Sequence, residues 1–356
     1  MKKQSYAINF LLILGLTAFG LWFALKDHYR EVLGMLANLS IVAIIVIFMY
    51  GLSYNFIIGW IYKIIGKTYK HSYRYKDGLA VAFVGAFFSG ITPSASGGQF
   101  AQAYILKQQG LKMSSGLSLL WIDFIIYQSV MVAYTTVLMV LRFTYYFTEQ
   151  SSFFILVLIG YLINSAVIVF LYTMAKFPKA YTRLSGFVVR LLGKLHIVKH
   201  PEETLAKWNV SLNQFTKEIQ EIKHKKKMVI KCVALNVLRL TLLYALPLFI
   251  AYLMKLDVNI GMLFDVITMS AFVMIANAFL PVPGASGGTE AAFILIFSTL
   301  FSGVEANSIM ILWRFATYHL IMLVGGMCFI ILKRKYDKQK VSVITKEDYH
   351  ENSDLY

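Results

Sequence analysis

The sequence is short of the residues that build disulfide frameworks and metal centres. It contains two cysteines, Cys232 and Cys328, and both lie in apolar runs. Their placement indicates neither a disulfide framework nor a metal site, so both are expected to be small core residues. No cluster of His, Cys and Asp has the spacing of metal ligands. We therefore expect no metal and no cofactor.

Signatures of common enzyme classes are also missing from the sequence. It has no phosphate loop ending in Gly-Lys-Ser or Gly-Lys-Thr, which argues against an ATP-driven pump. It has no Gly-x-Ser-x-Gly nucleophile elbow. The loops between the apolar runs leave no room for a separate catalytic domain. The residues by themselves therefore predict no enzyme.

Charge is scarce, since 15% of the residues are charged and 58% are hydrophobic. Soluble domains are about 45–50% apolar. Long windows with almost no charge are typical of membrane-spanning helices. The apolar runs are 7–25, 36–62, 78–92, 97–106, 115–141, 152–174, 229–254, 260–282, 288–302 and 306–332. We predict an all-α polytopic membrane protein over residues 1–335, with about eight spanning segments plus broken or re-entrant helices.

The run at 7–25 has a basic start but is too long for the core of a signal peptide, and no small-residue cleavage site follows it. It is predicted to be the first transmembrane helix. The runs 78–92 and 97–106 are too short to cross a hydrocarbon core of about 30 Å, so they are expected to form a re-entrant pair. The pair 260–282 and 288–302 is either re-entrant or a full hairpin.

Acidic residues are outnumbered, which leaves a net charge of +16. If the N-terminus is inside, 28 of the 34 Lys and Arg residues lie in inside segments and four lie in outside segments. This asymmetry predicts a multi-pass protein of the bacterial cytoplasmic membrane with both termini cytoplasmic. Nucleic-acid binding is the other explanation of the charge, and the distribution over the loops disfavours it.

The polar part of the chain is predicted at one side of the membrane. Residues 175–228 contain a basic amphipathic helix around 179–195, expected to lie along the inner leaflet, and a second helix around 202–226. Residues 336–356 are mixed in charge and are predicted to be a disordered cytoplasmic tail.

Two stretches of the sequence resemble each other, with six agreeing positions when Pro93 is set against Pro283. "GITPSASGGQFAQAYIL" begins at Gly90, and "LPVPGASGGTEAAFILI" begins at Leu280. The topology has the first motif (78–112) approached from the inside and the second (260–302) from the outside. Such an inverted repeat is typical of transporters, whose substrate site lies near the bilayer midplane between broken helices. The alternative is two hairpins with tight glycine turns.

The two motifs have the composition of an anion site. Helices that resume at 96–98 and 286–288 would expose N-terminal amides, which suit phosphate. Glycines would let the backbone approach a ligand, and hydroxyls would cap the helix or donate a hydrogen bond. For the serines, capping without a ligand is an equal alternative. These candidates are Ser94, Ser96, Gly97, Gly98, Ser286, Gly287, Gly288 and Thr289.

Six ionisable residues fall within the predicted spans, where such groups are functional candidates by default. Arg314 and Tyr318 share a helical face and form a predicted anion clamp. Glu290 either complements its own helix dipole, or pairs with Arg314 or a cationic headgroup. The others form a predicted intramembrane charge network: Asp123, with Arg239 as its candidate partner, Asp265 and His319.

Three segments together resemble a known family: "PSASGGQFAQAYILKQQG" from Pro93, "PVPGASGGTEAAF" from Pro281, and "LWRFATYHL" from Leu312. They resemble the membrane domain of lysylphosphatidylglycerol synthases, the flippase-like multiple peptide resistance factors, over residues 5–335. The resemblance implies movement of aminoacylated phospholipid to the outer leaflet. Its motif positions here are Pro93, Gly97, Gly98, Gln99, Pro283, Gly284, Gly287, Gly288, Glu290 and Arg314.

In that family a separate C-terminal soluble domain transfers lysine from lysyl-tRNA to phosphatidylglycerol, and nothing in this sequence corresponds to it. The expected function is therefore translocation of an anionic or aminoacylated phospholipid or glycolipid, which supports resistance to cationic antimicrobial peptides. The alternatives are a phosphatidylglycerol lysyltransferase, alone or with a synthase subunit, and a noncatalytic membrane scaffold. Expected partners are membrane lipids, with a separate lipid synthase or glycosyltransferase left open. No nucleic acid is expected, and the oligomeric state is open.

Overall fold

The computed structural model describes residues 29–92, 95–149, 151–194, 200–277 and 282–353, and in these ranges the chain is built of helices. Six helices are long and apolar enough to cross a membrane. The prediction of an all-α polytopic membrane protein is thereby confirmed. The predicted first span at 7–25, together with Pro93 and Ser94, lies outside the described residues.

The helices follow the predicted runs closely. They are α2 (Tyr29–Ala37), α3 (Ile41–Gly66), α4 (Tyr75–Gly90), α5 (Ser96–Gln108), α6 (Met113–Glu149), α7 (Ser151–Lys176), α8 (Pro178–Lys194), α9 (Pro201–His224), α10 (Lys226–Leu253), α11 (Leu263–Asn277), α12 (Gly288–Phe297), α13 (Gly303–Arg314) and α14 (Leu320–Ser353). Short 3₁₀ turns cover Ile260–Met262 and Pro283–Ala285, and a π-helical turn, Phe315–His319, joins α13 to α14.

Polar side chains mark where the apolar helices begin. Ser40 precedes α3 and accepts a hydrogen bond from the Ala43 amide at 3.1 Å. Before α13, Ser302 accepts from the Glu305 amide at 3.3 Å, and Glu305 accepts from the Ser302 amide at 2.9 Å. These caps satisfy backbone donors that have no partner within the helix, which matters most where water is scarce.

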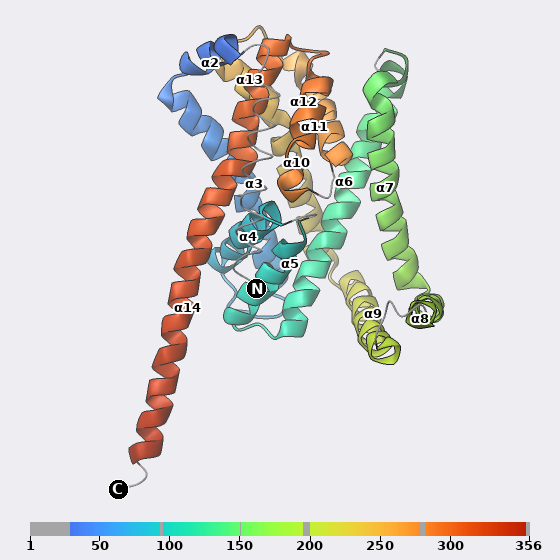
Figure 1. Cartoon of the computed structure of the whole chain (residues 1–356), viewed down its shortest axis with the longest axis vertical. Helices are drawn as coiled ribbons and strands as arrows, with labels where there is room; N and C mark the ends of the chain where they lie inside the picture. The colour runs from blue at the N-terminus through green and yellow to red at the C-terminus, as the bar shows by residue number, and fades with distance from the viewer. Residues whose placement is uncertain (1–28, 93–94, 150, 195–199, 278–281, 354–356) are drawn as a thin grey trace.

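Two pairs of short helices enter the bundle from opposite ends (Figure 1). α4 and α5 lie in the lower half of the view, whereas α11 and α12 lie in the upper half. α12 has 10 residues and therefore covers about 15 Å, half of a hydrocarbon core. The second pair is thus not a full transmembrane hairpin, which resolves the alternative that the sequence left open.

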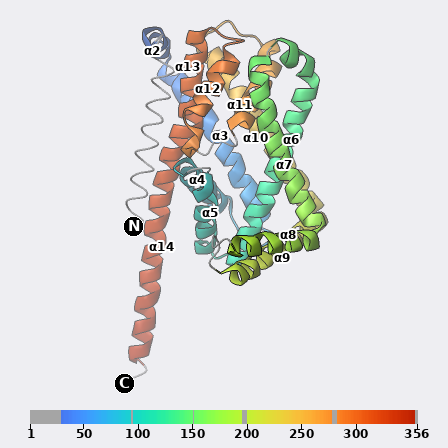
Figure 2. The same cartoon turned by 45° about the vertical axis from the view of Figure 1, so that its right-hand side comes forward.

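The basic segments gather at one end of the molecule. The α3–α4 and α5–α6 connections lie at the lower end, where α8 and α9 run crosswise beneath the long helices (Figure 2). No residue of α8 is buried, and its apolar side chains, including Leu184 and Phe187, are exposed. This arrangement fits a helix that lies in a membrane interface. Which end faces the cytoplasm remains a prediction.

The end of the chain differs from the expectation. A disordered tail was predicted at 336–356, whereas α14 continues as a helix to Ser353. The physical reason is local: after Gly326 the helix contains neither glycine nor proline, and lysine, a good helix former, recurs along it. Mixed charge therefore does not end the helix where the apolar run ends.

Candidate functional site

A cavity of about 690 Å³ lies in the middle of the bundle, and both broken pairs reach it. Ala95 lines it from the first break, and Gly284, Ala285 and Thr289 line it from the second. The remaining wall comes mainly from α3, α4, α6, α7, α10 and the α13–α14 junction. The two repeated motifs, distant in sequence, therefore meet at one cavity.

The first break is closed largely by its own side chains. Ala95 has a positive φ of 55°. The Thr92 hydroxyl accepts a hydrogen bond from the Gly97 amide at 2.8 Å and donates to the Phe88 carbonyl at 2.7 Å. One of the α5 amides that the sequence offered to an anion is therefore already capped.

The second break is capped by a carboxylate. Gly284 and Gly287 have φ values of 61° and 84°, the left-handed region that favours glycine. The Gly287 amide donates to Glu290 Oε2 at 2.6 Å. Glu290 is 6% exposed and lies in the first turn of α12. It therefore satisfies the N-terminus of its own helix.

Arg314 holds the second break from the side. Its Nε donates to Glu290 Oε1 at 2.6 Å, and one terminal nitrogen donates to the Gly284 carbonyl at 2.7 Å and to Ser286 Oγ at 3.3 Å. Its guanidinium also lies over the Tyr318 ring, 4.3 Å from the centroid. Glu290 thus fulfils two of the predicted roles at once. The guanidinium is largely occupied by protein acceptors.

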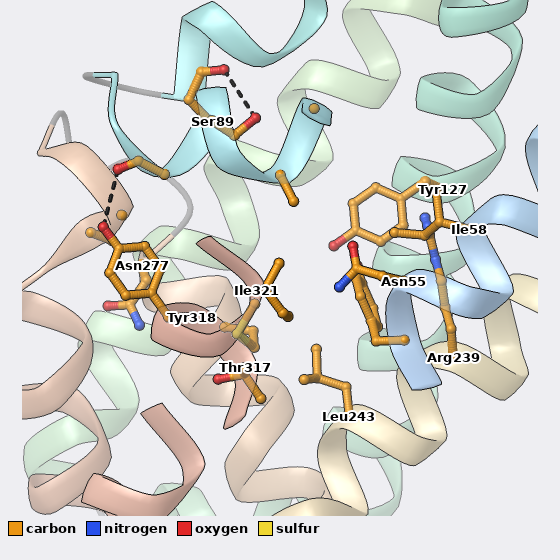
Figure 3. Close-up of a pocket in the computed structure, with 18 of the residues that line it drawn as sticks. Asn55, Ile58, Ser89, Tyr127, Arg239, Leu243, Asn277, Thr317, Tyr318 and Ile321 are labelled. Carbon is orange, nitrogen blue, oxygen red and sulfur yellow. Dashed lines mark hydrogen bonds between the residues drawn. The ribbon is translucent and has the colours of Figure 1, made fainter. Parts of the chain in front are cut away.

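The π-helical turn that carries Tyr318 connects the two breaks. The Tyr318 hydroxyl donates to the Gly90 carbonyl, at the end of α4, at 3.1 Å. Figure 3 shows this bond on the far side of the cavity from Arg239. Arg314, just before the turn, holds Gly284. π-Helical turns are rare and are frequent at functional sites.

One comparison with known proteins decides the family. A family model described as the lysylphosphatidylglycerol synthase TM region matches residues 7–325, which include both motifs and Arg314. The chain belongs to this family. No curated protein and no solved structure matches it. Membership of this family supports a lipid-related role in a membrane.

The cavity also carries a second charged cluster. Arg239 of α10 is 3% exposed, and its guanidinium lies 4.4 Å from the Tyr127 ring centroid and 5.2 Å from that of Tyr54. Asp123 of α6 lines the same cavity. The two charged groups influence each other electrostatically, but no ion pair joins these two described side chains.

The predicted charge network does not form as one cluster. Asp265 pairs with Arg142 at 2.8 Å, away from the cavity. His319 contacts the Phe315 ring at a tilt and the Tyr318 ring edge-on, with centroids 5.0 Å away in each case, and it does not line the cavity. The prediction of a shared network is wrong for both, because helical position alone does not say which neighbouring helix faces a side chain.

The predicted headgroup residues are placed unevenly. Four of them line the cavity: Gly284, Thr289, Arg314 and Tyr318. Gln99 lies instead on a pocket of about 90 Å³ between α5 and α6. The others that the structure describes support the breaks without lining the cavity: Ser96, Gly97, Gly98, Pro283, Ser286, Gly287, Gly288 and Glu290.

Sequence reasoning missed several polar cavity residues. Asn55 and Tyr62 lie seven residues apart on α3, and Tyr127 lies four residues after Asp123 on α6. Both spacings place side chains on one helical face. Polar residues recurring on one face of an otherwise apolar span are the signal that could have found them.

Proposed function

We propose that this chain moves a phospholipid or glycolipid with an anionic or aminoacylated headgroup between the two leaflets of a bacterial membrane. The observation that carries the proposal is the single cavity of about 690 Å³, lined by both breaks and by the buried cation Arg239. Cavities at the meeting point of oppositely inserted broken helices are typical substrate sites of transporters. Movement of charged lipid to the outside would contribute to resistance to cationic antimicrobial peptides.

The wall formed by α7 supports access from the bilayer. Ile163 lines the cavity and is nonetheless 41% exposed, and Val167 lines the cavity one turn further along α7. A lipid could place its headgroup in the cavity from this side while its acyl chains stay in the hydrocarbon. The headgroup then avoids crossing the hydrocarbon, where a charge is costly.

The contacts around Tyr318 support a moving part. One short segment holds Gly90 of the first break and, through Arg314, Gly284 of the second. Rocking one repeat against the other would have to change at least one of these contacts. We propose that these hydrogen bonds fix the position of one break relative to the other. Breaking them and forming others in their place would expose the cavity to one leaflet and then to the other.

The test is a leaflet-resolved assay in liposomes that contain the purified full chain and acyl-labelled phospholipids. A membrane-impermeant quencher reports the label that reaches the outer leaflet. We expect the chain to accelerate this movement, and the double variant Glu290→Gln with Arg314→Ala to reduce the accelerated rate about tenfold or more, equivalent to about 1.4 kcal/mol.

The matched control is the double variant Asp265→Asn with Arg142→Gln, which removes an ion pair that does not line the cavity. It should keep the wild-type rate once equal reconstitution is verified. If lipid moves no faster in liposomes with the wild-type chain than in protein-free liposomes, the proposed function is wrong. Equal rates for wild type and the Glu290/Arg314 variant would remove the role of the second break.

A further inference from the structure

Arg239 is a buried cation without a hydrogen-bonded acceptor among the described residues. It is 3% exposed, its Nε is buried, and that Nε donates to none of the described residues. Its guanidinium lies over the rings of Tyr127 and Tyr54. Ring faces attract a guanidinium but do not accept its in-plane N–H groups as a phosphate or carboxylate does. An arginine whose neighbours are ring faces keeps those donors for a ligand.

Asp123 is the negatively charged residue that lines the same cavity. Its Oδ1 is buried and accepts from no described donor. Next to the carboxylate lies the Tyr62 hydroxyl, which in turn accepts from Gln102 Nε2 at 2.9 Å. A buried carboxylate with an unfilled acceptor is costly unless a donor arrives. A ligand can supply that donor.

The described charged residues that line the cavity have one unpaired positive group and one unpaired negative group. Asp123, Arg239 and Arg314 are the charged residues among its described lining. Arg314 is neutralised by Glu290 at 2.6 Å. What remains is one positive and one negative group, which are not in salt-bridge contact with each other. A headgroup with one anionic and one cationic group would satisfy both, whereas a headgroup with only negative charge would leave Asp123 facing an anion.

From this geometry we infer that Arg239 and Asp123 form a subsite for a zwitterionic lipid headgroup, with the phosphate on Arg239 and the ammonium on Asp123. The inference rests on the proposed function and narrows its substrate class to headgroups that carry both a phosphate and an ammonium group. The planar guanidinium, held between Tyr127 and Tyr54, matches phosphate oxygens in pairs. Tyr62 and Gln102 position the carboxylate. Glu290 and Arg314 are positioning residues of the second break and do not bind the headgroup.

The test measures binding separately from transport. The purified full chain in an uncharged maltoside detergent is titrated with short-chain phosphatidylethanolamine or with short-chain phosphatidylglycerol, by calorimetry. We expect the wild type to bind the ethanolamine lipid about tenfold more tightly, which is about 1.4 kcal/mol. Asp123→Asn should abolish or reverse this preference, because the carboxylate no longer repels the anionic lipid.

Arg239→Gln should weaken the binding of both lipids, since it removes the phosphate partner that they share. If Arg239→Gln does not fold, Arg239→Lys keeps the charge without the planar fork and should weaken both lipids while retaining the preference. The matched controls Asp265→Asn and Arg142→Gln make the same chemical changes away from the cavity and should bind as the wild type does.

Two results would overturn the subsite: equal affinity of the wild type for the two lipids, or an unchanged preference in Asp123→Asn. The liposome assay keeps the two proposals apart. Headgroup-selective binding that responds to Asp123→Asn, without any translocation, would remove the proposed function and keep the subsite. Translocation at the same rate for both lipids, in the wild type and in Asp123→Asn, would remove the subsite and keep the proposed function.

Discussion

Gly284 and Gly287 lie three residues apart in the same break, yet the structure makes different demands on them. Both have positive φ, at 61° and 84°. A Cβ on Gly284 would run into the ring and hydroxyl of Tyr318, whereas a Cβ on Gly287 would meet nothing within 4 Å. The first glycine therefore serves both conformation and close packing, and the second serves conformation alone.

The pair gives a prediction with an internal control. Gly287→Ala should lower the free energy of unfolding by about 1–2 kcal/mol, the cost of a left-handed alanine. Gly284→Ala should cost about 1–3 kcal/mol more, because it adds a steric overlap to the strain. Unfolding of both purified variants in one detergent measures the difference. Equal losses would show that Tyr318 does not confine Gly284.

Among the elements, the α4–α5 pair is anchored at its open end by one glutamine. Gln109 Nε2 donates to the Asp77 carbonyl at 2.8 Å, and Gln109 Oε1 accepts from the Tyr73 hydroxyl at 2.9 Å. Lys70 Nζ donates to the Gln109 carbonyl at 2.7 Å. These bonds fix the end of α5 to the α3–α4 connection and so hold the first break in place.

Gln109→Ala should therefore cost about 1–3 kcal/mol of unfolding free energy, because it removes two partly buried side-chain hydrogen bonds. Gln108→Ala is the matched control, since the neighbouring Gln108 side chain makes no hydrogen bond with the residues that the structure describes. Chemical denaturation of the two variants in the same detergent compares them. A loss at Gln108 as large as that at Gln109 would contradict the anchor.

The same anchor gives a pH dependence. Burial, and then the nearby Asp77, raise the pKa of Tyr73, which lies in the connection between α3 and α4. A raised tyrosine pKa contributes stability that is complete below the unfolded value of about 10 and is lost as the pH rises above it. Between pH 6 and pH 9 we expect Tyr73 to cause no change in the unfolding midpoint. Above pH 10, the wild type should lose more stability than Tyr73→Phe does.

At the scale of the whole molecule, the basic segments lie at one end and the breaks enter from both ends (Figure 1). Lys67 lies exposed directly after α3, and Lys255 lies exposed just after α10. α3 ends toward the lower end of the bundle and α10 toward the upper end (Figure 1). The charge asymmetry predicts that the lower end is cytoplasmic. The two lysines therefore report the orientation of the entire bundle.

Single cysteines at these positions test the orientation. In intact expressing bacteria, an impermeant maleimide should label Lys255→Cys and should label Lys67→Cys only after lysis. The native Cys232 is fully buried and Cys328 is half-buried, so the unsubstituted chain supplies the background signal. Labelling of Lys67→Cys in intact cells would reverse the predicted topology.

The sequence by itself determined the class of the protein, most helix boundaries and the two breaks. The reason is that these depend on local properties: runs of apolar residues match the bilayer thickness, and glycine and proline interrupt helices wherever they occur. The position of Glu290 in the first turn of a helix was likewise visible, because a carboxylate three residues after a break is a local capping signal.

Only the tertiary structure decided how the charged side chains are used. Arg314 is occupied by Glu290 and Gly284, so among the described lining residues the cation without an acidic partner is Arg239, which shares the cavity with Asp123 of another helix. Membrane helices that are apolar on every side carry no periodic signal for the face that meets a given neighbour. Partners between helices therefore follow from the packing of the bundle, and the local pattern of residues does not encode them.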